Sequence, residues 1–448
     1  MRKRIAAFLA LTCAMGAVSA KTLSMDAYLA AVQQNNKDLA LAKVAVSQAD
    51  ATLRKALSTV IPTLGVSLGY QRSFSSIKLG DDYLDDNPQI AAYYPLVKDD
   101  LDDGKHNQLT VGIGAQWNIY DPSNAGNIRL AKEGKAVQSV AEAYTLDSLR
   151  HGARVLYSQV QLLQSVLSVK QEMAETSRAV YEMQKRKYDA GTLAELDMRL
   201  SEVDMKNDEL GVMQAKKNLS SGLTAFRVLA GYDPDDDIEP VADDGSDVEA
   251  PSEAYAIDDA LANRLDWQIA LLSRQVAQTK VENSYLLYNP SVSMSASYLF
   301  GTIGGLPDSN NPFSLGDVNA NLFTIGFTVT LPVSTGGYRL ANTQDAKLEV
   351  EKANLNLLKK QDAIKQELKD VQLEGELAQS QLEAARVIVT TSQRAVDLAR
   401  TSVENGLATQ TTLTQAETQL AQAKVNLASA RYACKVALYD GEFAMGRH

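Results

Sequence analysis

The sequence is poor in cysteine and aromatic residues and has no long apolar run. Its 448 residues include 2 cysteines, 2 tryptophans and 8 phenylalanines. Scarce aromatics and common alanine favour long helices packed through small side chains over thick globular cores. Beyond the N-terminus no stretch approaches 18 uninterrupted apolar residues, so we expect no membrane-spanning helix.

The sequence also lacks the motifs of catalysis and cofactor binding. The three histidines, His106, His151 and His448, do not have metal-ligand spacing. There is no cysteine pair, Walker loop, dinucleotide fingerprint or nucleophile elbow. We therefore expect no enzyme, no cofactor and no metal site, and we interpret Cys434 as a small packed hydrophobe. A formal charge of −11 argues against nucleic acid as a partner.

Residues 1–20 have the pattern of a secretory signal peptide. A basic segment at 2–4 precedes an apolar stretch at 5–11, and the small residues Val-Ser-Ala end at Ala20. We expect cleavage after Ala20. Lipidation of Cys13 is the alternative, although the threonine before it fits a lipoprotein signal poorly.

A heptad pattern in the C-terminal part predicts a long helical hairpin. Small or apolar residues alternate at spacings of four and three over 364–403, then a stop at Asn405-Gly406 follows, and the pattern resumes. No proline follows Pro332, so the sequence predicts a helix at about 334–404 and a return helix at about 408–440. The seam of the first arm comprises Ile364, Leu368, Val371, Gly375, Ala378, Leu382, Ala385, Val389, Ser392, Val396, Ala399 and Val403.

A similar hairpin is predicted in the first half. Asp121-Pro122 places an N-cap before proline at the first position of a helix at about 122–189. The return helix at about 193–230 and an approach helix at about 38–61 together nearly equal its length. We therefore expect these two shorter helices to stack end to end along the long one.

Matched landmarks indicate two repeats. Asp38 to Pro62 and Asp266 to Pro290 each span 24 residues, an offset of 228. Later landmarks recur at an offset of 210 and then of 215. The offset of 215 relates Gly191 to Gly406, and it relates the glutamates eleven residues after them, Glu202 and Glu417. We predict a first repeat at 21–231, an acidic inter-repeat segment at 232–256, and a second repeat at 257–448.

Each repeat contains two segments with strict alternation of apolar and polar residues. We predict strands at about 64–74, 109–120, 291–300 and 322–332. Their length of about 10 residues matches transmembrane strands, although a soluble antiparallel sheet also alternates. Four strands cannot close a membrane barrel, and an open edge in lipid leaves backbone groups unsatisfied. If these strands span a membrane, several copies must share one barrel.

In this order the features resemble the TolC family of outer-membrane efflux ducts. The resemblance rests on Ile61-Pro62-Thr63-Leu64, its copy Asn289-Pro290-Ser291-Val292, the segment Leu331 to Gly337, and the two glycine-tipped hairpins. It covers nearly the whole mature chain. It implies a mainly α-helical protein with a membrane β part, formed as a trimer with a 12-strand β-barrel on a 12-helix α-barrel.

The resemblance also implies location and partners. The protein would lie in the outer membrane of a double-membraned bacterium, surrounded by lipid and extending through the periplasm. It would be the exit duct of a tripartite efflux or type I secretion system. Its partners would be a periplasmic adaptor and an inner-membrane pump of RND, ABC or MFS type. The alternatives are a periplasmic coiled-coil adaptor or a scaffold without a pore, and the two hairpins with four strands disfavour both.

Several residues are candidate functional positions. Pro62 and Pro290 mark helix-to-strand turns, and Pro122, Gly126, Pro332, Gly336 and Gly337 mark strand-to-helix turns. Gly191 and Gly406 mark the hairpin tips, which the resemblance makes the adaptor-docking ends.

Two charged residues near the tips are candidates for a periplasmic gate. Asp197 lies six residues after Gly191, and Arg400 lies six residues before Gly406, so both are roughly 9 Å from the tips. Family members have an acidic residue six positions after both tip glycines. Here the second of these positions is Thr412.

The loops between paired strands would lie outside the cell. The loop at 73–107 is rich in aspartate, and the loop at 301–320 is its shorter counterpart.

Overall fold

The computed structural model describes residues 21–75, 79–92, 95, 104–246, 255–302 and 319–447. The signal peptide and parts of both predicted external loops therefore lie outside the described residues. The chain divides into two compact units. The first contains Met1–Val46, Val137–Leu271 and Leu355–His448, and the second contains Ser47–Ala136 and Leu272–Asn354.

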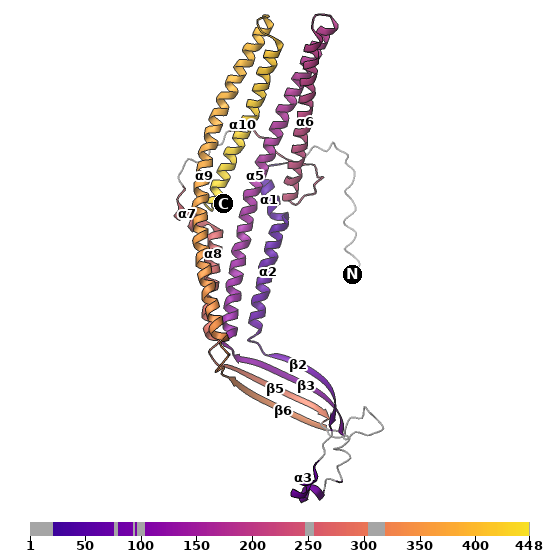
Figure 1. Cartoon of the computed structure of the whole chain (residues 1–448), viewed down its shortest axis with the longest axis vertical. Coiled ribbons are helices and arrows are strands. Elements are labelled where there is room, and N and C mark those ends of the chain that lie inside the picture. Colours follow the sequence, from indigo (N-terminus) through magenta and orange to yellow (C-terminus); the bar gives the residue numbers. More distant parts are fainter. Residues whose placement is uncertain are drawn as a thin grey trace, which may run out of the picture. The chain divides into compact units, whose positions relative to one another are not determined.

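Long helices make up most of the described chain (Figure 1). The helices are α1 (Met25–Asn35), α2 (Lys37–Ser58), α3 (Asp81–Asp86), α5 (Pro122–Asp189), α6 (Glu195–Leu229), α7 (Ile257–Asn263), α8 (Leu265–Leu286), α9 (Tyr338–Glu404) and α10 (Gln410–Ala444). The strands are β1 (Lys21–Leu23), β2 (Thr63–Ser75), β3 (Gly104–Tyr120), β4 (Ile238–Pro240), β5 (Ser291–Thr302) and β6 (Asn319–Thr330). None of the helices in the described part of the chain is both long and apolar enough to cross a membrane.

In the first unit, the heptad seam of α9 packs against α10. Leu382 and Cys434 are fully buried in one cluster, and Val396 packs with Leu413 and Leu420 in another. Burying a leucine of this kind stabilises by about 1.5–3 kcal/mol. Cys434 is thus a packed side chain within the seam.

An aromatic cluster joins α1 to α5 and α6. The rings of Tyr28 and Phe226 stack with centroids 3.9 Å apart, and Tyr157 is tilted against both. The hydroxyl of Tyr157 donates to the backbone oxygen of Leu23, which holds the parallel β1–β4 pair against α5. Burial raises the pKa of Tyr28 and of Tyr157, so both phenols stay neutral donors.

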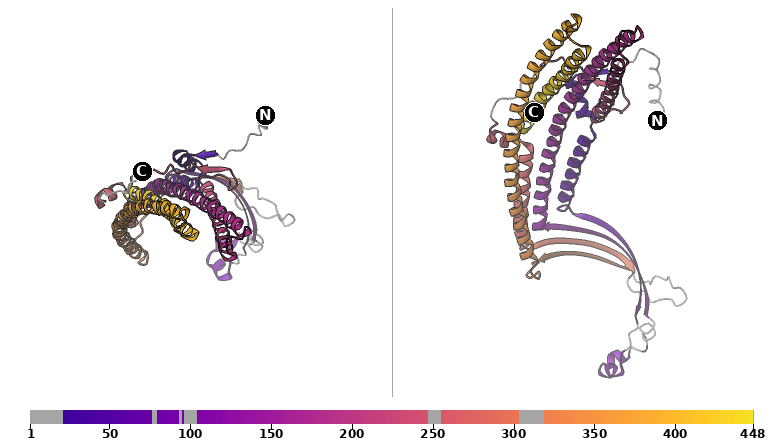
Figure 2. Two further views of the ribbon diagram at one scale, coloured as in Figure 1. Left: turned by 90° about the horizontal axis from the view of Figure 1, so that it is seen from above. Right: turned by 45° about the horizontal axis from the view of Figure 1, so that its top comes forward.

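The second unit contains a four-stranded antiparallel sheet in the order β2-β3-β5-β6. The right-hand view of Figure 2 shows these strands side by side. Alternation and register together place the apolar residues in cross-strand rows. Val66 pairs with Ile113, Ile113 with Tyr298, and Tyr298 with Phe323. All four side chains therefore lie on one face of the sheet.

Some element limits differ from those expected. The second long helix begins at Tyr338 rather than near Ser334, because Gly336 and Gly337 have φ of 59° and 86° and cannot continue a right-handed helix. Strand β3 begins at Gly104 rather than near Leu109, and β6 covers Asn319–Thr330 rather than 322–332. Cross-strand pairing sets these strand limits, and it is not visible in one strand's own alternation.

Candidate functional site

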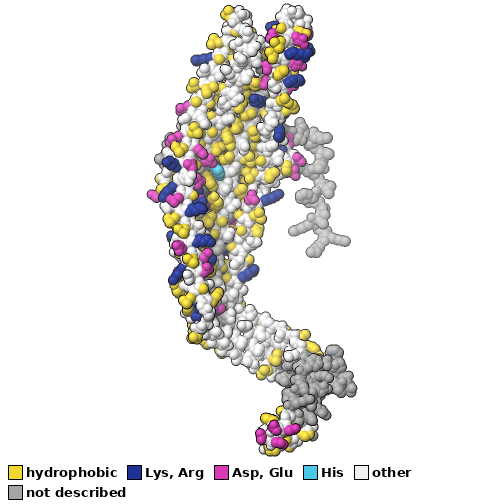
Figure 3. All heavy atoms as spheres, in the orientation of Figure 1, with side chains coloured by type: hydrophobic (Ala, Val, Ile, Leu, Met, Phe, Trp, Pro, Cys, Tyr) yellow, Lys and Arg dark blue, Asp and Glu magenta, His cyan; other side chains and the backbone are white. Residues whose placement is uncertain are grey.

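The apolar face of the sheet is exposed. Val66 is 78% exposed and Phe323 is 63% exposed, although both belong to cross-strand apolar rows. The opposite face carries glycine, serine and threonine at the alternating positions. The face of the strands visible in Figure 3 is mostly white, with few hydrophobic side chains and no Lys, Arg, Asp or Glu. The rows of exposed apolar side chains on the strands require a non-aqueous environment or a partner.

The sheet also has two open edges. Strand β2 pairs only with β3, and β6 pairs only with β5, among the described residues. Each edge strand therefore has one row of backbone groups with no ladder partner in the described part of the chain. Such groups cannot remain unsatisfied in lipid, so the sheet of one chain is incomplete as a membrane structure.

The predicted turn residues lie where strands and helices meet. Pro62 directly precedes β2, and Pro290 directly precedes β5. Pro122 is the first residue of α5, and Asp121 accepts from the backbone N–H of Ser123 at 2.9 Å. Proline suits these positions because it has no N–H to leave without a partner.

Glycine is required for different reasons at the two strand-to-helix turns. Gly126 lies inside α5, where a Cβ would approach the Asn283 side chain to 2.4 Å. Gly336 and Gly337 lie before α9 in left-handed conformations. Next to them, Arg339 is buried, donates to the backbone oxygen of Pro332, and lies 5.0 Å from the centroid of the Tyr288 ring. The turns thus share a place in the chain but not a geometry.

The two hairpin tips have the same backbone geometry. Gly191 has φ 73° and Gly406 has φ 70°. The next residue bonds back five positions in each case, from Thr192 N–H to Lys187 O and from Leu407 N–H to Ser402 O, at 2.9 and 2.8 Å. This is the Schellman arrangement, which satisfies the last carbonyls of α5 and α9.

The return helices begin differently. Helix α10 has Thr409 at its N-cap, whose hydroxyl accepts from Thr412 N–H at 3.3 Å. Helix α6 has Ala194 there with no side-chain cap, but Glu195 and Asp197 lie in its first turn. Asp197 and Thr412 both occupy the third helical position. An acidic side chain there offsets the positive helix terminus, and a threonine N-cap does the same by hydrogen bonding.

Within one chain Arg400 has a partner other than Asp197. Its guanidinium lies 3.7 Å from Glu417 of α10, whereas Asp197 is exposed on α6. Burial raises the pKa of Glu417, and the charge of Arg400 opposes that rise. The repeat landmarks Glu202 and Glu417 therefore differ in partner, because Glu202 pairs with Arg199 of its own helix. Sequence spacing pointed to Glu417 only as a landmark and gave no sign of this pairing.

Two cavities lie between α5 and the second hairpin, close to these charges. One of about 170 Å³ is lined by Glu172, Arg400, Glu417 and Lys424, and another of about 400 Å³ extends to Met183 and Gln410. Lys424 donates to both carboxylate oxygens of Glu172 at 2.8 and 2.9 Å. This ion pair joins α10 to α5 beside the cavities.

Residues 29–231 and 256–446 match the family model described as outer membrane efflux protein. The chain belongs to the outer membrane efflux protein family. Members of this family are non-enzymatic conduits, and the chain is accordingly an outer-membrane channel protein extending through the periplasm. The groups of His, Cys, Asp and Glu within the described ranges include none that could hold a metal ion.

Solved structures of outer-membrane channels share the fold of this family member. The Campylobacter jejuni CmeC outer membrane channel aligns with a TM-score of 0.77 and 17% identity, covering 94% of this chain and 85% of that chain. The outer membrane protein VceC of Vibrio cholerae aligns with a TM-score of 0.72 and 17% identity, covering 94% of this chain and 96% of that chain. The open state of the Neisseria gonorrhoeae MtrE outer membrane channel aligns with a TM-score of 0.70 and 15% identity, covering 97% of this chain and 93% of that chain. Comparison with curated protein sequences gave no significant match.

Proposed function

We propose that the chain is the outer-membrane exit duct of a tripartite efflux or type I secretion system. The observation that carries this proposal is the sheet of β2, β3, β5 and β6, which has one exposed apolar face and two open edges. A soluble antiparallel sheet would bury its apolar face against a core, so lipid is the environment that fits the exposed one.

Closure of the sheet supports a trimer. The smallest membrane barrels have about eight strands, so four strands from one chain are too few. Channels of this family are trimers. Three copies would give a 12-strand barrel in which β2 of one copy pairs with β6 of the next, leaving no open edge.

Repeat-equivalent contacts support the helical tube of the proposed duct. The Schellman bonds at the two tips recur at an offset of 215 residues, and α6 and α10 have the same length of 35 residues. In the helical unit, Arg178 of α5 pairs with Glu209 of α6, Lys424 of α10 pairs with Glu172 of α5, and α9 packs on α10. The helix order is therefore α6-α5-α10-α9, and the two outer helices would meet those of neighbouring copies.

The hairpin tips fit docking of a periplasmic adaptor that links the duct to an inner-membrane pump of RND, ABC or MFS type. Leu407, beside Gly406, is highly exposed and belongs to a tip that buries little of its own apolar surface. The chain's two hairpins and its four strands of membrane length disfavour the alternatives of an adaptor or a scaffold without a pore.

The outer position of α6 and α9 bears on the candidate gate. Asp197 lies on α6 and Arg400 lies on α9, so a pair between them would form across copies and not within one chain. Glu417 competes for Arg400 from within the chain. We retain the Asp197–Arg400 pair as a proposed latch of the closed tips, with Glu417 as the partner that would hold Arg400 when the tips separate.

Extraction and reconstitution would test the proposed function. The mature protein should leave outer membranes only with detergent, have the native mass of three chains, and form discrete channels in planar lipid bilayers. Release by a carbonate wash, or a stable single chain in detergent, would refute the shared barrel. Trimers that form no channel would refute the duct.

A further inference from the structure

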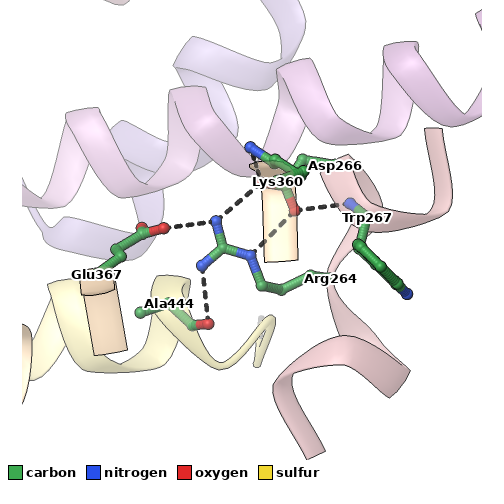
Figure 4. A network of polar contacts seen from close by, with 6 residues as sticks. All are labelled: Arg264, Asp266, Trp267, Lys360, Glu367 and Ala444. Atoms are coloured by element: carbon green, nitrogen blue, oxygen red, sulfur yellow. Dashed lines mark hydrogen bonds and ion pairs between the residues drawn. The ribbon is translucent and has the colours of Figure 1, made fainter. Parts of the chain in front are cut away.

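A buried ionic network joins the end of α10 to the start of α8 (Figure 4). Arg264, which directly precedes α8, donates through Nη1 to the backbone oxygen of Ala444 at 3.0 Å. It also forms two hydrogen bonds with Asp266, at 3.0 and 2.8 Å. Arg264 is 5% exposed and Asp266 is 9% exposed at the side chain. We call this network the α10–α8 joint.

The joint connects two helix ends of opposite polarity. Arg264 places a positive charge at the C-terminal carbonyl of α10, and Asp266 places a negative charge in the first turn of α8, where it also accepts from Trp267 N–H at 2.9 Å. Both placements are those that the helix dipole favours. The joint therefore places the end of α10 and the start of α8 at one buried point.

The first repeat has a neutral counterpart, the α6–α2 joint. Asn36 donates from Nδ2 to the backbone oxygen of Leu229 at 3.0 Å, and its Oδ1 accepts from the N–H groups of Asp38 and Leu39. Asn36 and Arg264 differ by 228 residues, and Leu229 and Ala444 by 215, the offsets found from the sequence. One uncharged side chain thus does here what Arg264 and Asp266 do together in the second repeat.

The charged side chains of the α10–α8 joint also pair with α9, which supplies one partner to Asp266 and one to Arg264. Lys360 lies 2.7 Å from Asp266, and Glu367 lies 2.8 Å from Arg264. Between them Ile364 is fully buried against Ala260, Ala444 and Met445 in one apolar cluster.

These two α9 partners lie on one face of the helix. Lys360 and Glu367 are seven residues apart, which is close to two full turns. A rotation of α9 by one residue, about 100°, would remove both partners from the joint at once.

We propose that the α10–α8 joint is a rotational clamp on α9, which fixes the setting of that helix as far as its tip. The tip end of α9 lies 37 residues beyond Glu367, roughly 55 Å at 1.5 Å per residue. The heptad seam with α10 carries the rotational setting over that length, since each seam side chain fits only one hole on the facing helix. In the neutral α6–α2 joint, the hydrogen bonds of Asn36 within the described part of the chain join backbone groups of Leu229, Asp38 and Leu39, and none involves a charged side chain of α5.

A paired substitution in the full-length trimer tests the clamp. Of its two readouts, amide exchange and conductance, the conductance measurement rests on the proposed channel function. Lys360→Met with Glu367→Gln removes both α9 partners and leaves Arg264 and Asp266 paired. The control is Asp362→Asn with Lys365→Met, which removes an exposed ion pair from the same stretch of α9. Hydrogen–deuterium exchange of peptides covering 396–420 reports on the tip, and single-channel conductance in planar bilayers reports on its opening.

The clamp predicts about tenfold faster exchange at the tip and a higher conductance in the test variant, with both unchanged in the control. Faster exchange confined to residues near Ala444, with tip exchange and conductance as in the wild type, would overturn it. If the double variant fails to assemble, Lys360→Met alone, at a side chain 36% exposed, should give a smaller change in the same direction. A wild-type trimer without channels would refute the proposed function, while tip exchange would still decide about the clamp.

Discussion

The two helical hairpins of this chain, α5–α6 and α9–α10, have the same backbone plan and different side-chain chemistry. Their tip glycines have φ of 73° and 70°, and the bonds that close the two tips recur at one offset. Their return helices, however, start with different caps, and their joints are neutral in one case and ionic in the other. Backbone geometry is thus set by a few glycines, whereas the strength and the charge of each hairpin are set separately.

The largest expected difference lies in the seams. Leu382 of α9 is fully buried, whereas Leu167, which is equally distant from its own tip glycine, is only half-buried on α5. Leu382→Ala should lower the free energy of unfolding by about 2–5 kcal/mol through transfer and cavity terms. Leu167→Ala should cost less than about 2 kcal/mol. Denaturant unfolding of the trimer in detergent would measure both, and equal losses would remove this distinction between the hairpins.

The joints should differ in their response to acid. Burial alone would raise the pKa of Asp266, but hydrogen bonds and charges from Arg264 and Lys360 together outweigh it and lower the pKa to about 2. Since that pKa is below its ordinary value of 3.8, the pair stabilises the fold fully above about pH 4. This contribution, about 2 kcal/mol, is lost as the pH falls from there through about 2.

Amide exchange at the two joints measures this difference. Between pH 5 and 3 protection near Ala444 should fall, after correction for intrinsic exchange, while protection near Leu229 should not, because Asn36 does not titrate. Asp266→Asn should remove the acid dependence at Ala444. An equal fall at both joints would assign the effect to general acid unfolding.

Substitutions at the two N-caps should change the stability of their helices in opposite directions. Thr409→Ala removes a hydroxyl that accepts from Thr412 N–H and should destabilise α10 by about 1 kcal/mol. Ala194→Ser adds a missing cap to α6 and should stabilise it by about 0.5–1 kcal/mol. Thermal unfolding of each single variant against the wild type gives the comparison. No gain on Ala194→Ser would mean that the acidic first turn already replaces the cap.

The smallest expected effects concern the proposed latch between Asp197 and Arg400. Exposed ion pairs contribute about 0.2–1 kcal/mol each, yet three copies around one ring can bias an opening equilibrium. Asp197→Ala and Arg400→Ala should each raise single-channel conductance, and the double variant should add little. Glu417→Gln distinguishes the partners, because it should not raise conductance if Arg400 holds Asp197 in the closed state. Unchanged conductance in both single variants, or strictly additive effects, would exclude the pair.

Much of the fold could be predicted from local patterns. Period-two alternation located the four strands, the heptad repeat located the seam that contains Leu382 and Cys434, and glycine with its neighbours located both tips. These features could be predicted because each depends on residues close together in the chain. Element limits were less certain, since Gly336 and Gly337 delay α9 and since pairing between strands lengthens β3.

By itself, the sequence determined the period of each element and the positions of both hairpin tips, and it predicted that four strands need further copies to close a barrel. Only the tertiary structure decided which charges meet. Arg264, Lys360 and Glu367 lie up to 103 residues apart in the chain, and Arg400 and Glu417 are separated by a hairpin tip. Ion pairs and buried caps depend on which faces of distant helices are brought together, and that arrangement is fixed by packing along the whole length of α9 and α10 and not by spacing in the sequence.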